Sequence, residues 1–362
     1  MSETVMKKEE RIAFELRSLY KRYGYLPYKM GKFEEYDLYV ANKEFLVGDG
    51  VVTFTDTNGK LLALKPDVTL SIIKNDAEGK GKRKVYYNEN VYRISPKTKR
   101  FKELMQVGLE CFGDVDGYDV FETVLLATKS LACISPNFVL DISHSGIVSA
   151  LLKAIGGGEA FSALATKYIA DKNAHETEAL CNEYGVSKAN TEKLLLLIDA
   201  YGSPKEVLEK IASLKDIAKD AYEELKTLCD NLAKTEYADK IRLDFSVSND
   251  MAYYDNVVFK GFVDGISEGV LSGGRYDKLM AKMGKKDGAI GFAVYLDLFE
   301  GFGEEKSGVD VDALVLYAKD TPTETVVKTV ERLVGEGKSV RAQTTADGIR
   351  YAELVDVAGV KV

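Results

Sequence analysis

Three residues of one segment, Gln106, Gly108 and Glu110, are spaced two apart, as residues on one face of a β-strand are. The glycine between the two polar groups would leave room for a ligand beside the backbone. Arg93, at the end of the strand expected to oppose this segment, would supply a fixed cation. A guanidinium that faces a carboxylate and an amide suits a small zwitterion. The alternative is a solvated sheet face with an ordinary Arg–Glu pair.

Two other groups of polar residues each have two interpretations. Basic residues surround the turn expected between these strands: Lys97, Lys99, Arg100 and Lys102. They form either a solvated hairpin tip or a contact for a phosphate or an acidic partner. Asp67 and Thr69 stand at an expected helix start, where capping of free backbone N–H groups would by itself explain both residues.

Two segments further along the chain would add to a binding site. Gly273-Gly274-Arg275 would let a ligand approach the backbone, although tight sheet turns use glycines in the same way. Tyr253 and Tyr254 are either ligand contacts or aromatic residues at the edge of the core. Ser143-His144-Ser145 follows an expected strand, but it lacks nucleophile-elbow glycines and an acid partner in the sequence, so no catalytic triad is expected.

The elements that would position these residues alternate between short strands and helices. Short β-rich runs predict strands at 33–40, 51–55, 61–64, 85–93, 102–112 and 138–142. Asn58-Gly59 predicts a hairpin turn, and the strands that flank the basic segment would form a second, longer antiparallel hairpin. Apolar residues at helical spacing predict helices at 9–23, after Asp67, and at 119–133.

Residues 147–240 are expected to form a helical insertion, because apolar residues recur there at helical spacing. Within it, Ser203-Pro204-Lys205-Glu206 combines an N-cap serine, a proline in the first turn and a returning glutamate. The insertion would divide a core domain made of residues 1–146 and 241–305. A last unit, 309–362, is expected to hold a strand, a helix, a second strand parallel to the first, and then another helix.

Composition is that of an ordinary globular protein with two or three domains: 362 residues, 46% hydrophobic and 29% charged. The net charge of −8 argues against a chain-wide nucleic-acid surface, so tRNA is not an expected partner. The four cysteines form no CxxC pair and only two histidines are present, so we expect no metal site, no disulfide framework and no cofactor. The charged N-terminus and the lack of a long apolar run predict a cytoplasmic protein without a signal peptide or a membrane span.

Several segments, in this order, resemble the catalytic core of class II aminoacyl-tRNA synthetases, and among them histidyl-tRNA synthetase. Leu64-Lys65-Pro66-Asp67-Val68-Thr69 resembles the substrate-binding stretch Arg-Pro-Glu-x-Thr of that family. The hairpin with Gln106-Val107-Gly108-Leu109-Glu110 resembles the second class-defining motif, and Ser272 to Asp277 resembles the glycine-rich histidine-binding motif. The resemblance implies an α+β fold: an antiparallel sheet with flanking helices, a helical insertion and a small truncated α/β unit like an anticodon-binding domain.

Three departures from that family remove charged groups. Ser95 stands where active synthetases have a glutamate that grips adenine, and Asn249 to Tyr254 replaces Arg-Gly-Leu-Asp-Tyr-Tyr without its arginine and aspartate. Leu298 replaces the arginine that clamps the nucleotide. Adenylation needs such cations at the α-phosphate, and losing one contact of this kind costs about 2.7–4 kcal/mol. The resemblance therefore implies a protein that binds and regulates without activating an amino acid.

A paralogue of this description is the regulatory subunit of short-form ATP phosphoribosyltransferase, the first enzyme of histidine biosynthesis. The resemblance implies a homodimer through the class II core that joins the catalytic subunit in a hetero-octamer. Such a subunit would be required for activity and for allosteric feedback by histidine. The alternatives are a divergent histidyl-tRNA synthetase and a synthetase-like amino-acid sensor.

The resemblance also implies a set of ligand-binding residues and no catalytic ones. The residues carried over are Asp67, Thr69, Arg93, Gln106, Glu110, Tyr253, Tyr254, Gly273, Gly274 and Arg275. In the hypothesis that histidine is the ligand, Glu110 and Gln106 face an ammonium or imidazole group, and Arg93 faces an anion.

Overall fold

The chain divides into two compact units, Met1–Phe302 and Gly303–Val362. The structure is a computed structural model, and it describes residues 6–42, 46, 50–75, 81–94, 98–250, 254–300, 302 and 308–359, with the backbone alone for 248–250. Within these ranges no helix is long and apolar enough to cross a membrane. The same ranges contain no group of three or more His, Cys, Asp or Glu side chains that could hold a metal ion.

A nine-stranded sheet forms the centre of the first unit. Its spatial order is β1 (Leu26–Pro27), β5 (Arg83–Ile94), β6 (Phe101–Gly113), β12 (Gly288–Tyr295), β11 (Leu271–Arg275), β10 (Val257–Val263), β7 (Phe138–His144), β9 (Ile241–Asp244) and β8 (Tyr201–Gly202). All neighbours from β5 to β7 are antiparallel, whereas β1 pairs in parallel with β5, and β9 with β7. The long β5–β6 hairpin expected from the sequence is therefore confirmed.

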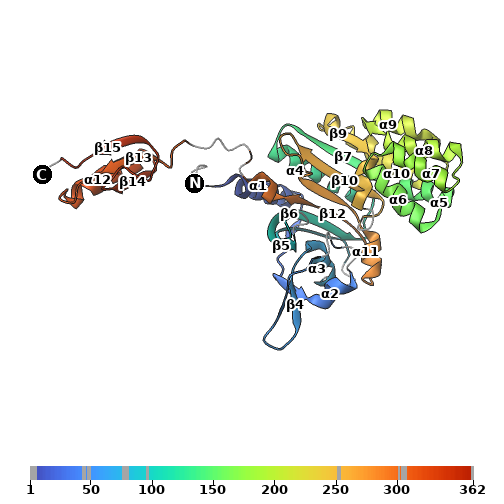
Figure 1. Ribbon diagram of the computed structural model, residues 1–362, viewed down its shortest axis with the longest axis horizontal. Coiled ribbons are helices and arrows are strands. Elements are labelled where there is room, and N and C mark those ends of the chain that lie inside the picture. Colours follow the sequence, from blue (N-terminus) through green and yellow to red (C-terminus); the bar gives the residue numbers. More distant parts are fainter. Residues whose placement is uncertain are drawn as a thin grey trace. The chain divides into compact units, whose positions relative to one another are not determined.

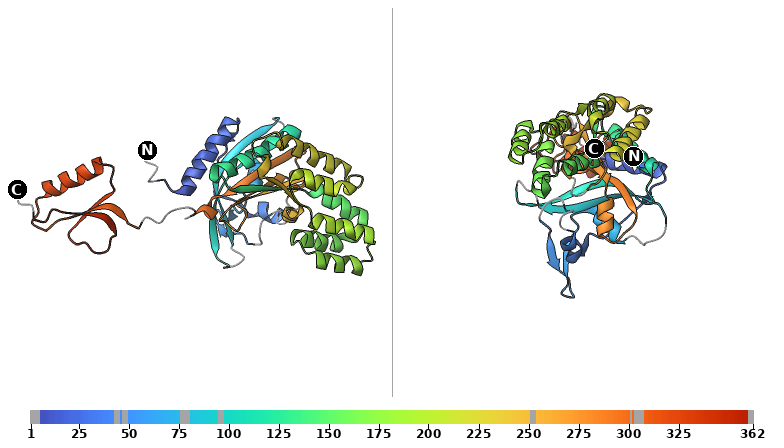
Figure 2. Two further views of the ribbon diagram at one scale, coloured as in Figure 1. Left: turned by 90° about the horizontal axis from the view of Figure 1, so that it is seen from above. Right: turned by 90° about the vertical axis from the view of Figure 1, so that its right-hand side faces the viewer.

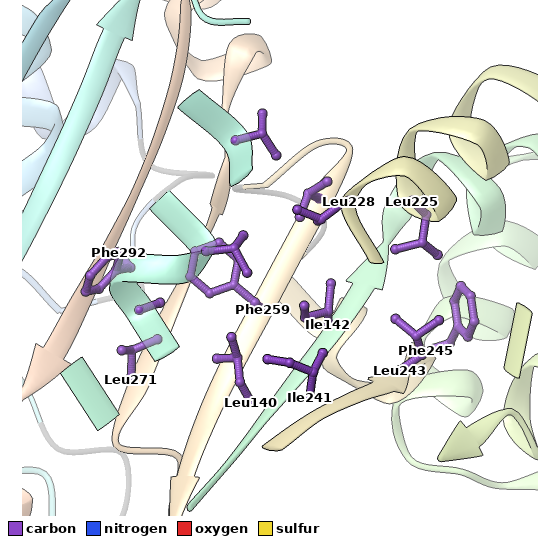
Figure 3. Close-up of a cluster of buried hydrophobic side chains, with 14 of the residues drawn as sticks. Leu140, Ile142, Leu225, Leu228, Ile241, Leu243, Phe245, Phe259, Leu271 and Phe292 are labelled. Atoms are coloured by element: carbon purple, nitrogen blue, oxygen red, sulfur yellow. The ribbon is translucent and has the colours of Figure 1, made fainter. Parts of the chain in front are cut away.

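One face of this sheet, the core face, packs against helices. The helices are α1 (Lys8–Arg22), α4 (Gly117–Ile134) and α10 (Lys219–Leu232). Figure 3 shows part of this core, in which side chains of the strands meet those of α10: Leu140, Ile142, Phe259, Leu225 and Leu228. Apolar residues alternate along these strands because successive side chains point to opposite faces.

The opposite face, the site face, is covered at its β5–β6–β12 end by a second apolar cluster. The covering elements are α2 (Tyr36–Ala41), α3 (Val68–Asn75), α11 (Asp277–Lys282) and a small antiparallel sheet of β2 (Phe33–Glu35), β4 (Leu61–Leu64) and β3 (Thr53–Thr55). Figure 1 shows α2, α3 and β4 together on this side of β5 and β6. This layer brings the start of α3 against the site face.

The helical segment lies beside β7 and β9, at the end of the sheet away from β5 (Figures 1 and 2). Its helices are α5 (Ser145–Ile155), α6 (Gly158–Ala170), α7 (Ala174–Glu183), α8 (Lys188–Ile198), α9 (Pro204–Lys210) and α10. The Ser203 hydroxyl accepts the Glu206 N–H, as the capping pattern predicts. Strand β8 interrupts the segment and joins the central sheet.

The expected strand at 33–40 is wrong beyond Glu35, where the chain turns into helix α2. Tyr36 and Tyr39 are three residues apart and both contact the second cluster, with Tyr39 fully buried. One face of a helix brings residues at this spacing together, whereas a strand would point them to opposite sides. Packing of the two tyrosines therefore outweighs the β-rich composition.

The second unit holds a parallel sheet of three strands in the order β14 (Val340–Gln343), β13 (Val311–Leu316) and β15 (Tyr351–Asp356), with α12 (Thr323–Gly335) between β13 and β14. The parallel strand–helix–strand order is confirmed. The last helix expected from the sequence is wrong, because β15 pairs with the free edge of β13. Val355 and Val357 join the small apolar core there, a contact that no local pattern reveals.

Candidate ligand-binding site

The centre of the candidate site is the Glu110 carboxylate, which lies over the backbone of the neighbouring strand. Glu110 in β6 is directly opposite Gly291 in β12, and Gly291 is directly opposite Gly274 in β11. A Cβ atom at Gly291 would come within 1.7 Å of Glu110 Oε2. Only glycine at position 291 therefore leaves space for this carboxylate.

Two hydroxyl groups donate hydrogen bonds to Glu110. Thr69 Oγ1 donates to Oε1 over 2.7 Å, and Tyr276 Oη donates to Oε2 over 2.5 Å. Burial raises the pKa of Glu110 to about 8, although both hydrogen bonds act in the opposite direction. Because this value lies near neutral pH, a bound cation or N–H donor would readily shift Glu110 to its ionised form.

Arg93 and Asp67 meet at the start of α3. Asp67 Oδ1 accepts the Leu70 N–H over 2.9 Å, so the expected capping role is present. Arg93 Nε donates to the Pro66 carbonyl over 2.8 Å, and its guanidinium lies 3.9 Å from Asp67 Oδ2. Burial raises the pKa of Asp67, and Arg93 opposes that shift. The structure thus places Arg93 against the α3 terminus, near the hairpin tip, rather than against Glu110.

Gln106 and Gly108 share the site face with Glu110, but the space beside Gly108 is filled. Tyr87 in β5 is directly opposite Gly108, and a Cβ on Gly108 would meet Tyr87 Oη at 2.4 Å. The room that the glycine was expected to leave for a ligand therefore holds the Tyr87 phenol. The Gln106 side chain is buried and makes no hydrogen bond to any residue that the structure describes.

The two glycines of the Gly273-Gly274 pair lie on opposite faces of β11. Gly274 is on the site face, where the Tyr254 ring lies against it: a Cβ would meet Tyr254 Cδ1 at 2.8 Å. Gly273 is on the core face, against Phe292 and Phe259. Consecutive residues of a strand alternate in direction, so the structure brings Gly274 to the candidate site and does not bring Gly273 there.

Arg275 turns toward α11 and α10. Its Nε donates to Asp277 Oδ2 over 2.7 Å, and Nη1 lies 3.7 Å from Glu224 Oε1. The side chain is thus engaged with two carboxylates of the protein itself. Its neighbour Tyr276 carries the contact to Glu110.

Parts of the expected site lie outside the described residues. These are Tyr253, Ser95 and Lys97, together with the side chain of Asn249. Lys99, Arg100 and Lys102 are exposed near the hairpin tip, so a contact with a phosphate or an acidic partner stays a prediction.

Leu298 lies in the short helix η5 (Leu296–Phe299) and packs against the main apolar core. The position at which synthetases of the family are expected to hold an arginine is thus apolar and contributes to packing.

Four site residues were missed by the sequence analysis: Tyr87, Tyr276, Ser272 and Tyr295. Tyr276 and Ser272 stand inside the glycine-rich motif, and the Ser272 and Tyr295 hydroxyls are 2.5 Å apart in a hydrogen bond. Tyr87 is found only from the register of the β5–β6 hairpin, which the sequence did not provide. Alternation along β5 assigns Tyr87 to a face but does not say which residue of β6 lies opposite it.

Acceptors and hydroxyl groups outnumber available cations in this cluster. Arg93 and Arg275 contact protein oxygen atoms, and fully buried Lys65 is 2.9 Å from Glu89 Oε2. Glu110 has an open acceptor capacity, since each of its oxygens accepts one described hydrogen bond. The arrangement suits a ligand with N–H donors or positive charge better than a nucleotide phosphate.

The antiparallel sheet, the long hairpin and the polar cluster on the site face define a class II aminoacyl-tRNA synthetase-like protein. Solved structures agree: one described as an ATP phosphoribosyltransferase regulatory subunit/histidyl-tRNA synthetase from Bacillus halodurans superposes with a TM-score of 0.76 at 22% identity, over 100% of this chain and 97% of that one. Histidyl-tRNA synthetase from Nostoc gives 0.70 at 17% identity, over 94% and 83%. These likenesses show the fold.

The chain belongs to the histidyl-tRNA synthetase family, whose model matches residues 1–298. Curated relatives in this family include proteins named ATP phosphoribosyltransferase regulatory subunit. The one from Alkaliphilus metalliredigens is 28% identical over 76% of this chain and 71% of its own length. The one from Ruminiclostridium cellulolyticum is 25% identical over 98% of this chain and 88% of its own.

Proposed function

We propose that the protein is a non-catalytic regulatory subunit of ATP phosphoribosyltransferase, the enzyme of the first step of histidine biosynthesis. The observation that carries the proposal is its similarity to regulatory subunits along almost the whole chain, 98% in the case of Ruminiclostridium cellulolyticum. A chain of the ATP phosphoribosyl transferase (HisG:HisZ) complex from Thermotoga maritima shares the fold, with a TM-score of 0.65.

The apolar environment of Leu298 supports the loss of aminoacylation. Activation of an amino acid develops negative charge at the α-phosphate, which a cation has to stabilise. A leucine packed against the core supplies none, and the described arginines near the site already contact protein oxygens. We therefore assign the candidate site to binding rather than to chemistry.

Histidine is the proposed ligand of the Glu110 cluster. An imidazole N–H or an ammonium group would use the remaining acceptor capacity of Glu110, and Gln106 would supply a neutral amide on the same face. Binding there would report the end product of the pathway to the catalytic subunit. Arg93 would meet an anion through its Nη groups while Nε stays on the Pro66 carbonyl, so the anion would lie at the start of α3.

A homodimer through the class II core, within a hetero-octamer with the catalytic subunit, completes the proposal. Large apolar side chains are exposed on α1, on edge strand β1 and at the start of α4: Phe14 (65%), Leu26 (67%) and Tyr118 (61%). Helix α1 and strand β1 both contact β5, and α1 contacts α4, so the three residues lie on neighbouring elements. Exposed apolar groups near a sheet edge are typical of a protein interface. The cytoplasmic location stays a prediction.

The decisive experiment mixes the chain with a short-form catalytic subunit and measures phosphoribosyl transfer with and without histidine. We expect activity to depend on the chain and histidine to inhibit the mixture. An unchanged rate of the catalytic subunit would favour an amino-acid sensor with another partner.

The family match favours one alternative, a divergent histidyl-tRNA synthetase. That enzyme would release pyrophosphate from ATP in a histidine-dependent reaction. We expect no such release from this chain alone, and observing it would overturn the regulatory assignment.

A further inference from the structure

Glu224 of α10 stands where the helical segment meets the motif that carries Tyr276. One of its carboxylate oxygens contacts His144 at the end of β7, and the other faces Arg275 at the end of β11. The pair is half-buried, with Glu224 and Arg275 side chains 35% and 22% exposed. A single side chain thus connects the helical segment to two strands of the sheet.

The tautomer of His144 follows from the two hydrogen bonds of its ring nitrogens. Its Nδ1 accepts the Gly146 N–H over 3.2 Å, so the ring proton is on Nε2, which donates to Glu224 Oε2 over 3.3 Å. The ring is buried, and a Cβ on Gly146 would come within 3.0 Å of Nδ1. His144 therefore has an acid partner that sequence alone did not reveal, in a fixed orientation.

Arg275 is held between the helical segment and α11. Glu224 Oε1 lies 3.7 Å from Nη1 on one side, and Asp277 Oδ2 accepts from Nε over 2.7 Å on the other. Asp255 holds the same backbone, because its carboxylate accepts the N–H groups of Asp277 and Lys278.

Tyr276 extends from this held backbone to the candidate site. Its hydroxyl donates to Glu110 over 2.5 Å, and its ring is buried. Arg275 and Tyr276 are consecutive residues at the end of β11, so a backbone shift at Arg275 would move the donor that Glu110 uses.

We propose that Glu224 is a positioning residue that couples the helical segment to the Glu110 cluster through Arg275 and Tyr276. With Glu224 bound to His144 and Arg275, Tyr276 stays at donating distance from Glu110. Movement of α10 away from Arg275 weakens that hydrogen bond and lowers ligand affinity. This inference rests on the proposed function only for the identity of the ligand, histidine.

The test compares Glu224→Gln with Glu223→Gln, a matched change at the preceding residue of α10. Glu223 pairs with Lys215 over 2.7 Å and has no hydrogen bond or ion pair to the described residues of the site, so it controls for loss of charge on the helix. Calorimetric titration with L-histidine is expected to show about 2- to 30-fold weaker binding for Glu224→Gln and unchanged binding for Glu223→Gln.

A second readout needs no ligand. The Tyr276 hydrogen bond lowers the pKa of Glu110, so weakening it raises that pKa further. The measurement uses protein labelled with ¹³C at the glutamate carboxyls, and Glu110→Gln assigns the Glu110 signal. We expect the pKa of Glu110 to rise in Glu224→Gln and to stay unchanged in Glu223→Gln. The effect should vanish in a Tyr276→Phe background, since the donor is already gone.

The outcomes distinguish a failure of the proposed function from a failure of the proposed coupling. Absence of histidine binding in the unmodified protein contradicts the proposed function, whereas the Glu110 titration still tests the coupling. Two results would overturn the coupling. One is the same pKa of Glu110 in Glu224→Gln and Glu223→Gln. The other is that Glu224→Gln weakens histidine binding as much in the Tyr276→Phe background as in the unmodified protein. Glu224→Asp, which keeps the charge but shortens the reach, should shift the titration in the same direction if Glu224→Gln does not fold.

Discussion

Glu110 is a carboxyl group that folding places out of reach of water, with two hydroxyl donors as partial compensation. Transfer of an ionised carboxylate into such a place is costly, so the group keeps its proton to higher pH than in the unfolded chain. Its protonation is consequently linked to folding and to binding of any cationic ligand.

The first prediction concerns stability between pH 4.5 and 8. In this window folded Glu110 holds a proton that the unfolded chain has lost, so the free energy of unfolding falls as pH rises. Glu110→Gln should remove a slope of about 1.4 kcal/mol per pH unit, the value for one proton. Urea unfolding of both proteins at pH 5, 6.5 and 8 measures the difference, and parallel curves would contradict it.

Asp141 provides the second prediction. Its Oδ1 is buried without a hydrogen-bond partner among the described residues, and burial together with nearby Asp244 raises its pKa to about 7. Asp141→Asn should therefore increase stability at pH 8, where the folded protein must ionise this group, and change it less at pH 5. The control Asp244→Asn should destabilise at both values, because Asp244 accepts from Lys172 and Ser246. Thermal melts of both variants and of the unmodified protein at pH 5 and pH 8 measure these changes in stability.

Strand β12 depends on a glycine at the point where the candidate site crosses it. A methyl group at Gly291 would overlap Glu110 Oε2 at 1.7 Å and the Leu109 carbonyl at 2.5 Å. Sheet register fixes the Leu109 carbonyl, and the Glu110 carboxylate can move away only by giving up its hydrogen bonds with Thr69 and Tyr276.

The third prediction is that Gly291→Ala lowers stability by about 1–3 kcal/mol, the usual cost of overpacking. Part of the loss should disappear in a Glu110→Ala background, because the carboxylate clash is then gone while the carbonyl clash remains. Gly117→Ala is the control, since nothing lies within 4 Å of its added Cβ. Melting temperatures of the four variants test this, and an undiminished loss in the double variant would count against the geometry.

Two elements illustrate how far local patterns extend at the scale of secondary structure. The β5–β6 hairpin is local: alternating residues on each strand and a polar turn predict it without any distant contact. Strand β15 is not local, because its partner β13 lies far away in sequence. A short segment of mixed composition adopts whichever structure its distant neighbours can hydrogen-bond.

At the scale of the molecule, strand β1 forms one of the two edges of the central sheet, and β8 forms the other. Leu26 of β1 is 67% exposed and lies at the edge on which we place the proposed dimer interface.

The fourth prediction rests on the proposed homodimer: Leu26→Asp should shift it toward the monomer, because the interface would have to desolvate a charge. Leu61→Asp is the matched control, since Leu61 is also exposed, at 47%, but lies in the β2–β4–β3 sheet. Sedimentation velocity at a series of concentrations measures both. Dimers of equal stability in the two variants would place the interface elsewhere.

The sequence by itself determined the family, the hairpin, the helical segment and part of the candidate cluster, namely Thr69, Gln106 and Glu110. These follow from motifs and periodicities that are contiguous in the chain. The tertiary structure alone decided that Tyr87 fills the space beside Gly108, that Gly273 faces the core, and that Arg93 and Arg275 turn to protein carboxylates. The physical reason is register: which side chains meet across strands depends on backbone hydrogen bonds between segments that are far apart in sequence.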